Sequence, residues 1–171
     1  MSSAADCHSP APPPKGLPVR NRLVAVVGPP NSGKSTLFNR LTGLHQKIAN
    51  YPGVTVEHHT GRMKARYTDT NLNFHVDLLD LPGIYSLDAR SEDERVTCDV
   101  LSGQMPGVPR PDAVLVILDA TNLGRQLMLA ASVLATGLPV MVLLNMADDL
   151  ARRGGEVDLH ALTSELGVQV A

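Results

Sequence analysis

Short runs of apolar residues, each ending at a glycine or a polar residue, recur along the chain from Leu23 onward. Runs of this length without internal charges are typical of strands buried on both faces of a sheet. Two other segments also look like strands, and the first of them alternates polar with apolar residues, as an exposed antiparallel edge does. The pattern predicts six strands, at about 23–28, 54–67, 72–80, 112–120, 138–145 and 168–171, with the last one truncated.

Amphipathic helices are predicted between these strands. After the first strand, Leu37, Phe38 and Leu41 form an apolar stripe at helical spacing. Ser91 and Glu94 have the spacing of a capping box, which marks the start of another helix. Strands that alternate with helices predict an α/β fold, with a mostly parallel sheet covered on both faces. The expected helices cover about 34–41, 91–101, 123–135, a short turn after 145, and 159–166.

The chain of 171 residues is long enough for one domain with a single core. Residues 1–20 are rich in Pro, Ala and Ser and predict a flexible arm, so the folded domain is expected over 21–171. A net charge of -2 implies no broad basic face, which argues against nucleic-acid binding. No apolar run approaches the roughly 20 residues of a membrane-spanning helix. Cys7 and Cys98 are expected as free thiols in a reducing, cytosolic compartment.

The segment GPPNSGKS, residues 28–35, fits the pattern G-x-x-x-x-G-K-[ST] between a predicted strand and a predicted helix. Successive backbone amides there can point into one concavity at a helix N-terminus, where the helix dipole favours an anion. Gly33 lets the backbone approach a phosphate, Lys34 supplies a positive charge, and the Ser35 hydroxyl can ligate magnesium. The segment therefore predicts phosphate binding by Gly28, Asn31, Ser32, Gly33, Lys34 and Ser35.

Two later motifs concern the metal ion and the base. DLPG, residues 80–83, follows a strand, where Asp80 can hold magnesium through water and the Gly83 amide can sense a terminal phosphate. NMAD, residues 145–148, follows another strand, and Asp148 there can accept two hydrogen bonds from the guanine N1 and N2 donors. Adenine has no matching pair of donors, so the motifs favour a guanine nucleotide.

The order of these motifs resembles the GTPases of the translation-factor-related superfamily, whose usual base motif is N-K-x-D. Here Met146 stands between Asn145 and the rest of the motif in place of Lys. A Met side chain can still cover the face of the base, but the Lys charge and its tether to the phosphate loop are lost. We therefore expect modest nucleotide affinity and fast nucleotide exchange.

Further segments narrow the resemblance. NYPGVTVE (50–57), DLPGIYSL followed by SEDERVTCD, DATNL (119–123), and NMAD followed by an acidic residue resemble the FeoB-type ferrous-iron transporter, and specifically its cytosolic N-terminal GTPase domain. The resemblance extends from Leu23 to Ala171. One departure is Pro29, where Asn is usual in that family.

The resemblance implies a Ras-like P-loop NTPase fold and a set of site residues. Thr55 would close on magnesium when GTP is bound, and Asn31 would coordinate a potassium ion that bridges the phosphates. That ion would stabilise charge that develops in the transition state, where other GTPases place an arginine. The implied catalytic residues are Asn31, Lys34, Thr55 and Gly83; the implied magnesium residues are Ser35, Thr55 and Asp80; further nucleotide contacts are Thr36, Gly53, Val54, Asn145, Met146 and Asp148.

The implied function is GTP binding and hydrolysis that energises or regulates ferrous-iron uptake. Besides GTP and GDP, the implied partners are the helical and membrane-spanning parts of the same transporter, with a small cytosolic accessory protein and a homo-oligomer as further expectations. The implied location is the cytoplasmic face of the bacterial inner membrane. On this interpretation the chain is a fragment of a longer protein, without the C-terminal loop that closes over guanine.

Ile84 follows Gly83 at a position where many nucleotide hydrolases carry a polar side chain that aims a water. An aliphatic side chain cannot polarise water, so a slow enzyme is predicted. Two alternatives stay open: a regulatory switch whose hydrolysis is too slow to matter, and a ribosome- or RNA-associated GTPase of the Era type. The six histidines are interpreted as surface or structural residues rather than an iron site.

Overall fold

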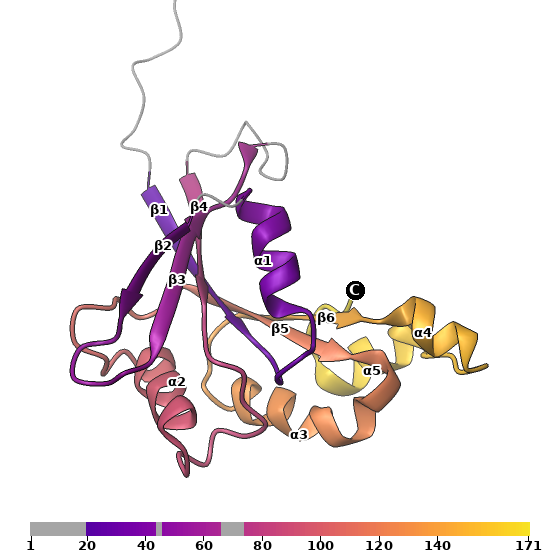
Figure 1. Ribbon diagram of the computed structural model, residues 1–171. Coiled ribbons are helices and arrows are strands. Elements are labelled where there is room, and N and C mark those ends of the chain that lie inside the picture. The colour runs from indigo at the N-terminus through magenta and orange to yellow at the C-terminus, as the bar shows by residue number, and fades with distance from the viewer. Residues whose placement is uncertain (1–19, 44–45, 66–73) are drawn as a thin grey trace, which may run out of the picture.

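The computed structural model describes residues 20–43, 46–65 and 74–171, which form one six-stranded sheet with helices around it (Figure 1). The strands are β1 (Arg20–Val27), β2 (Gln46–Asn50), β3 (Glu57–Arg62), β4 (Phe74–Asp80), β5 (Ala113–Asp119) and β6 (Val140–Asn145). The helices are α1 (Lys34–Thr42), α2 (Glu92–Ser102), α3 (Leu123–Leu134), α4 (Ala147–Arg152) and α5 (Leu159–Leu166), with a 3-10 turn, η2, at Ala120–Asn122.

The strand order is β2-β3-β4-β1-β5-β6. β1, β4, β5 and β6 run parallel, whereas β3 is antiparallel to both β2 and β4. In this register Val26 lies beside Asp80, and Asp119 lies beside Asn145. The carboxyl ends of the four parallel strands therefore open at one end of the sheet, where α/β proteins bind their ligands. The predicted fold class is confirmed, with β2 and β3 as its antiparallel edge.

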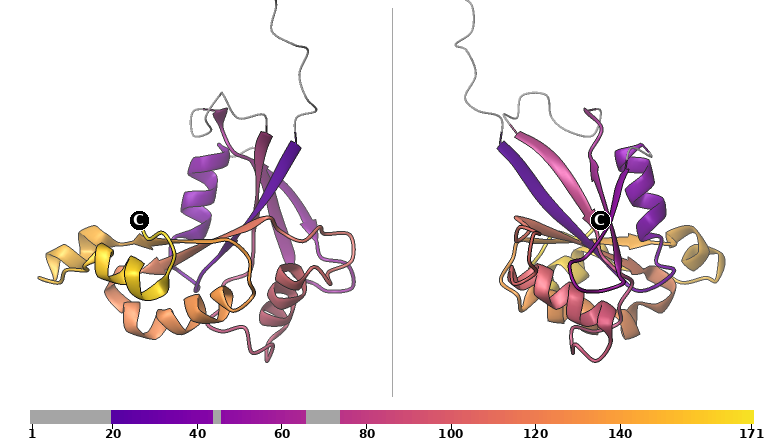
Figure 2. Two further views of the ribbon diagram at one scale, coloured as in Figure 1. Left: turned by 180° about the vertical axis from the view of Figure 1, so that it is seen from behind. Right: turned by 60° about the vertical axis from the view of Figure 1, so that its left-hand side comes forward.

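Two apolar clusters hold the helices on opposite faces of the sheet (Figure 2). Phe38 of α1 packs against Val26, Leu78 and Ile117 on one face. The larger cluster, on the other face, joins the sheet to α2 and α3, with side chains of α5 packed against it. Because Val and Ile fill the central strands, both faces of the sheet are apolar, as the continuous hydrophobic runs predict.

The strand predictions need three corrections. The segment expected as one strand over 54–67 is a strand only at Glu57–Arg62, since residues 51–56 form a loop and 66–67 lie outside the described residues. β2 has no counterpart among the predicted strands, because its sequence QKIAN is too polar to form an apolar pattern. The C-terminal VQVA contributes one isolated bridge, from Val170 to Val142, rather than a strand.

The helix predictions agree with the structure to within a residue or two. The capping box is present, since Ser91 Oγ accepts from the Glu94 amide at 3.2 Å and Glu94 Oε2 accepts from the Ser91 amide at 3.2 Å. The predicted arm lies outside the described residues except for Arg20, which begins β1. Among the described helices, none combines the length and the apolar character needed to cross a bilayer.

Candidate functional site

The loop between β1 and α1 runs from Gly28 to Gly33. Asn31 (φ 64°) and Gly33 (φ 90°) both have positive φ, so the chain turns tightly before α1 begins at Lys34. Gly33 provides no side-chain cap, which leaves the first amides of α1 open to an anion. A Cβ on Gly28 would collide with the carbonyl oxygen of Ile117, so the loop needs glycine there. The backbone therefore turns tightly between β1 and α1, and the Ser32 amide donates to the Pro29 carbonyl at 3.3 Å within the turn.

A lysine, a serine and an aspartate meet beside this loop. Burial lowers the pKa of Lys34, which is 8% exposed, while the charge of Asp80 acts in the opposite direction. Burial also raises the pKa of Asp80, against the charge of Lys34 and the hydrogen bond that Ser35 Oγ donates to Asp80 Oδ2 at 3.3 Å. The other carboxylate oxygen, Oδ1, is buried and has no hydrogen-bond partner among the described residues. The protein therefore leaves one buried oxygen available to a ligand.

These oxygen atoms fit a magnesium ion. Hydroxyl and carboxylate oxygens are the ligands that hard divalent cations prefer, and an unsatisfied buried carboxylate oxygen is a group that a cation or its water shell would satisfy. Ser35 and Asp80 are the described residues that would hold the ion beside the phosphate loop.

The DLPG segment is fixed against the phosphate loop by its backbone. The Leu81 amide donates to the Val26 carbonyl at 3.1 Å, and the Ile84 amide donates to the Gly28 carbonyl at 3.2 Å. A Cβ on Gly83 would lie 3.0 Å from the backbone nitrogen of Pro30, so a larger residue would crowd the loop. Ile84 itself is 2% exposed and belongs to the main core, so its side chain points away from any bound nucleotide.

The base motif lies at the end of β6, beside the phosphate loop. Asn145 Nδ2 donates to the Ser32 carbonyl at 2.9 Å. Met146 has φ 62° and precedes α4. The Asp148 side chain is exposed and pairs with Arg152, with Oδ2 and Nη2 3.2 Å apart. The carboxylate predicted to read guanine is thus held by a solvent-exposed ion pair, which is weak.

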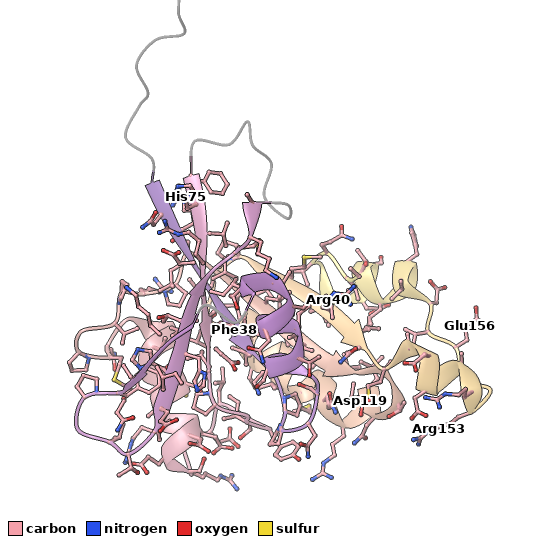
Figure 3. All side chains as sticks on the ribbon, turned by 45° about the horizontal axis from the view of Figure 1, so that its top comes forward. Phe38, Arg40, His75, Asp119, Arg153 and Glu156 are labelled. Carbon is pink, nitrogen blue, oxygen red and sulfur yellow. The ribbon has the colours of Figure 1, made fainter. Side chains whose placement is uncertain are left out.

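Asp119 ends β5 close to this motif, because it lies beside Asn145 in the sheet register. Its Oδ1 accepts from the Thr121 amide at 2.8 Å and from the Thr121 hydroxyl at 2.7 Å. Asp119 therefore caps η2. Figure 3 shows Asp119 at the end of its strand, with Arg153 and Glu156 farther out, after α4.

The loop over residues 51–56 joins β2 to β3 and carries Thr55, the residue expected to close on magnesium when GTP is bound. It is closed by a hydrogen bond from the Tyr51 amide to the Val56 carbonyl at 2.9 Å. Gly53 has φ 80°, Val54 is half-buried, and the Thr55 side chain is exposed. The loop lies toward α2, whereas the phosphate loop opens below α1 (Figure 1). Within the described residues, no hydrogen bond or ion pair joins Thr55 to Ser35 or Asp80.

Of the histidines, His59 lies opposite Asp80 in the sheet register, and its charge acts to lower the pKa of that carboxyl, against the effect of burial. The ring of His58 packs on Tyr51 with the ring centroids 4.6 Å apart. His75 and His160 are exposed. Within residues 20–43, 46–65 and 74–171, no three His, Cys, Asp or Glu side chains are placed to hold a metal ion together. His45 lies outside the described residues.

Three contacts of the site have no signal in the sequence. These are the Asn145–Ser32 hydrogen bond, the packing of Gly83 on Pro30, and the hydrogen bond from Ile84 to Gly28. Each joins residues that are far apart in the chain, so only the strand order could have revealed them.

A phosphate loop after β1, an acidic residue at the end of the neighbouring β4 and an Asn-x-x-Asp motif after β6 together define a P-loop NTPase domain of the G-domain class. The chain belongs to the family Ferrous iron transport protein B, whose model matches residues 22–171.

Curated relatives agree with this assignment. The chain is 41% identical over 145 residues to the Fe(2+) transporter FeoB of Leptospira interrogans, and the match covers 85% of the chain and 19% of that protein. It is 39% identical over 155 residues to a Fe(2+) transport protein A/Fe(2+) transporter FeoB fusion protein of Porphyromonas gingivalis, with 91% of the chain and 17% of that protein covered. The chain thus spans less than a fifth of the length of these relatives.

Solved structures show the same fold. A point mutant of S. thermophilus NFeoB bound to GDP has a TM-score of 0.77 at 40% identity, covering 87% of this chain and 54% of that one. The G domain of the T. maritima FeoB iron transporter has a TM-score of 0.74 at 32% identity, covering 88% of this chain and 86% of that one.

Proposed function

We propose that this chain binds GTP and GDP with Mg²⁺ and hydrolyses GTP, as the nucleotide-binding part of a ferrous-iron transporter. The observation that carries the proposal is the convergence of Lys34, Ser35 and Asp80 at the end of the parallel strands, with one carboxylate oxygen of Asp80 left unsatisfied. A GDP-bound structural neighbour of 40% identity supports the choice of guanine. The names of the relatives support iron as the transported ion.

Each residue of the loop has a separate role in this proposal. The backbone amides from Asn31 to Ser35, together with Thr36, surround the phosphates, and Lys34 neutralises their charge. Magnesium, when bound, would neutralise the phosphate oxygens that carry the developing charge, held by Ser35 and Asp80. Thr55 would join them only after the loop over residues 51–56, with Gly53 and Val54, moves toward the phosphate loop.

At the base end, the Asp148 carboxylate breaks its ion pair with Arg152 and accepts hydrogen bonds from guanine. The Met146 side chain covers the face of the base. The ion pair between Asp148 and Arg152 is exposed, so its loss costs at most about 1 kcal/mol. Asn145 donates a hydrogen bond to the Ser32 carbonyl, and this contact keeps the phosphate loop at a fixed distance from the base pocket.

Hydrolysis is expected to be slow. Water attacks the terminal phosphate in line with the leaving oxygen, and catalysis of this reaction depends on positioning and on electrostatics. The Ile84 side chain is buried in the core and cannot orient the water, which leaves the Gly83 amide and Lys34 as stabilising groups. The Asn31 side chain is exposed beside the loop, and we propose that its oxygen ligates an activating potassium ion.

The proposal is tested by measuring phosphate release from GTP and from ATP by the full 171-residue chain. GTP turnover that requires magnesium and falls by about a hundredfold or more in Lys34→Ala is expected. Arg40→Ala, an exposed residue of α1, is the matched control and should retain the rate. Equal use of ATP and GTP, or an unchanged rate in Lys34→Ala with the fold intact, would contradict the proposal.

Potassium is tested separately. Rates in potassium chloride should exceed those in sodium chloride, and Asn31→Ala should remove the difference. Equal rates in the two salts would exclude potassium activation and would leave the GTPase proposal unaffected.

The burial of Ile84 favours one other function, a switch module in which GTP and GDP act as conformational signals and hydrolysis is too slow to matter. Single-turnover hydrolysis slower than the release of GTP would support that alternative. In either case the helical and membrane-spanning parts of a longer transporter, at the cytoplasmic face of the membrane, are the proposed partners of this domain.

A further inference from the structure

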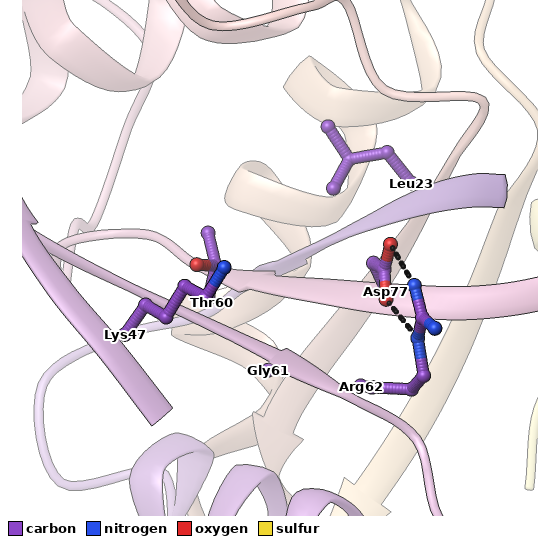
Figure 4. Close-up of a pocket in the computed structure, with 6 residues that line it drawn as sticks. All are labelled: Leu23, Lys47, Thr60, Gly61, Arg62 and Asp77. Carbon is purple, nitrogen blue, oxygen red and sulfur yellow. Dashed lines mark hydrogen bonds and ion pairs between the residues drawn. The ribbon is translucent and has the colours of Figure 1, made fainter. Parts of the chain in front are cut away.

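A cavity of about 540 Å³ lies on the sheet beside Leu23 and Asp77 (Figure 4). Its wall is formed by four strands, because Leu23 comes from β1, Lys47 from β2, Thr60 from β3 and Asp77 from β4. Leu23 packs against the larger core cluster, so the cavity opens on the face of the sheet that α2 and α3 cover. It is independent of the residues proposed for nucleotide binding.

The charges in this cavity are not balanced. Arg62 and Asp77 lie opposite each other on β3 and β4 and form a two-point ion pair, with Nε–Oδ1 at 3.0 Å and Nη2–Oδ2 at 3.4 Å. Lys47 lies opposite Thr60 on β2 and β3. No carboxylate of the described residues forms an ion pair with Lys47. Among the described residues that line the cavity, one positive charge therefore has no carboxylate to balance it.

The polar side chains of the cavity form two groups along the sheet. Figure 4 shows the Lys47 ammonium directed over Thr60 and the Arg62 guanidinium directed at Asp77, on either side of Gly61. The Thr60 hydroxyl adds a neutral hydrogen-bonding group beside the Lys47 ammonium. A negatively charged group placed there would contact the ammonium and the hydroxyl.

From this arrangement we infer that the cavity binds a small amphipathic carboxylate. The net charge of Lys47, Arg62 and Asp77 is one positive unit, which matches a monoanion. Leu23 supplies an apolar wall for the rest of the ligand. The volume falls within the range of about 300–1,000 Å³ that is typical of small-molecule sites.

Such a ligand would contact the strands that lead to the nucleotide end. β2 and β3 are joined by the loop over residues 51–56, and Asp77 stands three residues before Asp80 on β4. A carboxylate bound to Lys47 and Thr60 holds these two strands together and so restrains the loop between them. The site is therefore placed to regulate the movement of Thr55. This regulation does not depend on how fast the chain hydrolyses GTP.

The inference is tested by NMR titration of the ¹⁵N-labelled full chain with sodium benzoate, a carboxylate on an apolar ring. Saturable shifts of the Thr60 and Gly61 amides are expected. Benzyl alcohol, which has the same ring without the charge, should give no saturable shift at equal ionic strength. An absence of saturable shifts with benzoate, or equal shifts with benzyl alcohol, would overturn the inference.

Two variants locate the binding. Lys47→Gln removes the unbalanced charge from an exposed side chain and should weaken benzoate binding by about tenfold or more. Arg40→Gln removes a charge from α1, outside the cavity, and should leave the affinity unchanged. Binding of benzoate to Lys47→Gln with the affinity of the unmodified chain would also overturn the inference, since it would place the anion elsewhere.

Discussion

The side-chain amide of Asn145 donates to the backbone carbonyl of Ser32 at 2.9 Å and so joins two residues that are 113 positions apart. The contact ties the end of β6 to the phosphate loop. It also explains the glycine that follows, because a Cβ on Gly33 would collide with Asn145 Nδ2. The base motif and the phosphate motif are thus held together as one structural unit.

Asn145→Ala should weaken GDP binding by about fivefold to tenfold, because a hydrogen bond of this kind contributes about 1 kcal/mol. The loss comes from a phosphate loop that is no longer held in place. Titration with a fluorescent GDP analogue measures it. Asn122→Ala, which changes an exposed Asn that makes no side-chain cap at α3, is the control and should bind normally. Normal GDP affinity in Asn145→Ala would show that the tether is dispensable.

Ile84→Ala should destabilise the fold by about 2–4 kcal/mol, since it removes a core side chain that is 2% exposed. The hydrolysis rate per folded molecule should stay within a few-fold, because the side chain does not face the nucleotide site. Urea denaturation and phosphate release measure the two effects. Ile48→Ala is the matched control, because Ile48 is 62% exposed. A hundredfold loss of rate with the fold intact would assign Ile84 a catalytic role.

Met146→Lys restores the residue that is usual in the N-K-x-D motif and should slow the release of GDP. A lysine there supplies a charge near the phosphate loop, which methionine cannot do. Residue 146 has φ 62° in either case, so the backbone cost is the same for both side chains. Stopped-flow displacement of fluorescent GDP checks the prediction. Release as fast as in the unmodified chain would mean that Lys gains no contact with the loop.

Asp112 should make the stability of the fold depend on pH in the acid range. Its Oδ2 accepts from the Leu23 amide at 2.8 Å and its Oδ1 from Arg22 at 2.6 Å, and both contacts lower the pKa of its carboxyl. The folded state then binds the proton less tightly than the unfolded state. The stabilisation is therefore complete above about pH 4 and is lost as the pH falls through the lower, folded-state pKa.

Asp112→Asn should accordingly be less stable than the unmodified chain at pH 6, with a difference that shrinks as the pH falls below about 4. Thermal unfolding at several pH values measures this difference. Glu165→Gln, an exposed residue of α5, serves as control and should show no such convergence. A difference that is constant over the whole range would mean that the ionised carboxylate of Asp112 is not the stabilising group.

Much of the fold could be predicted, because its central strands are continuous apolar runs and its helices carry their own start signals. Ser91 with Glu94 is an example, since both capping hydrogen bonds are local. The positions of Lys34, Ser35 and Asp80 follow from the rule that parallel strands open their ligand site at one end. This rule predicts that the three side chains lie near one another, although it does not give the distances between them.

The antiparallel edge is harder to predict for physical reasons. Residues 47–50 of β2 are all exposed, Ile48 included. Because neither face of the strand is buried there, its sequence does not alternate between apolar and polar residues. It is a strand because β3 pairs with it, and that pairing is a tertiary interaction. The position of Thr55 depends on the same hairpin, so the sequence motif could name this residue but could not place it.

The last residues of the chain form a short mechanical linkage with the phosphate loop. The Leu144 amide donates to the carbonyl of Ala171 at 2.8 Å, and the next residue, Asn145, donates to Ser32. A force applied to Ala171 would act first on its hydrogen bond with Leu144. It would pass from there to the end of β6, and through Asn145 to the phosphate loop. Tension applied at that point of the chain would therefore act on the phosphate-binding amides within two hydrogen bonds, and nucleotide release would become sensitive to force.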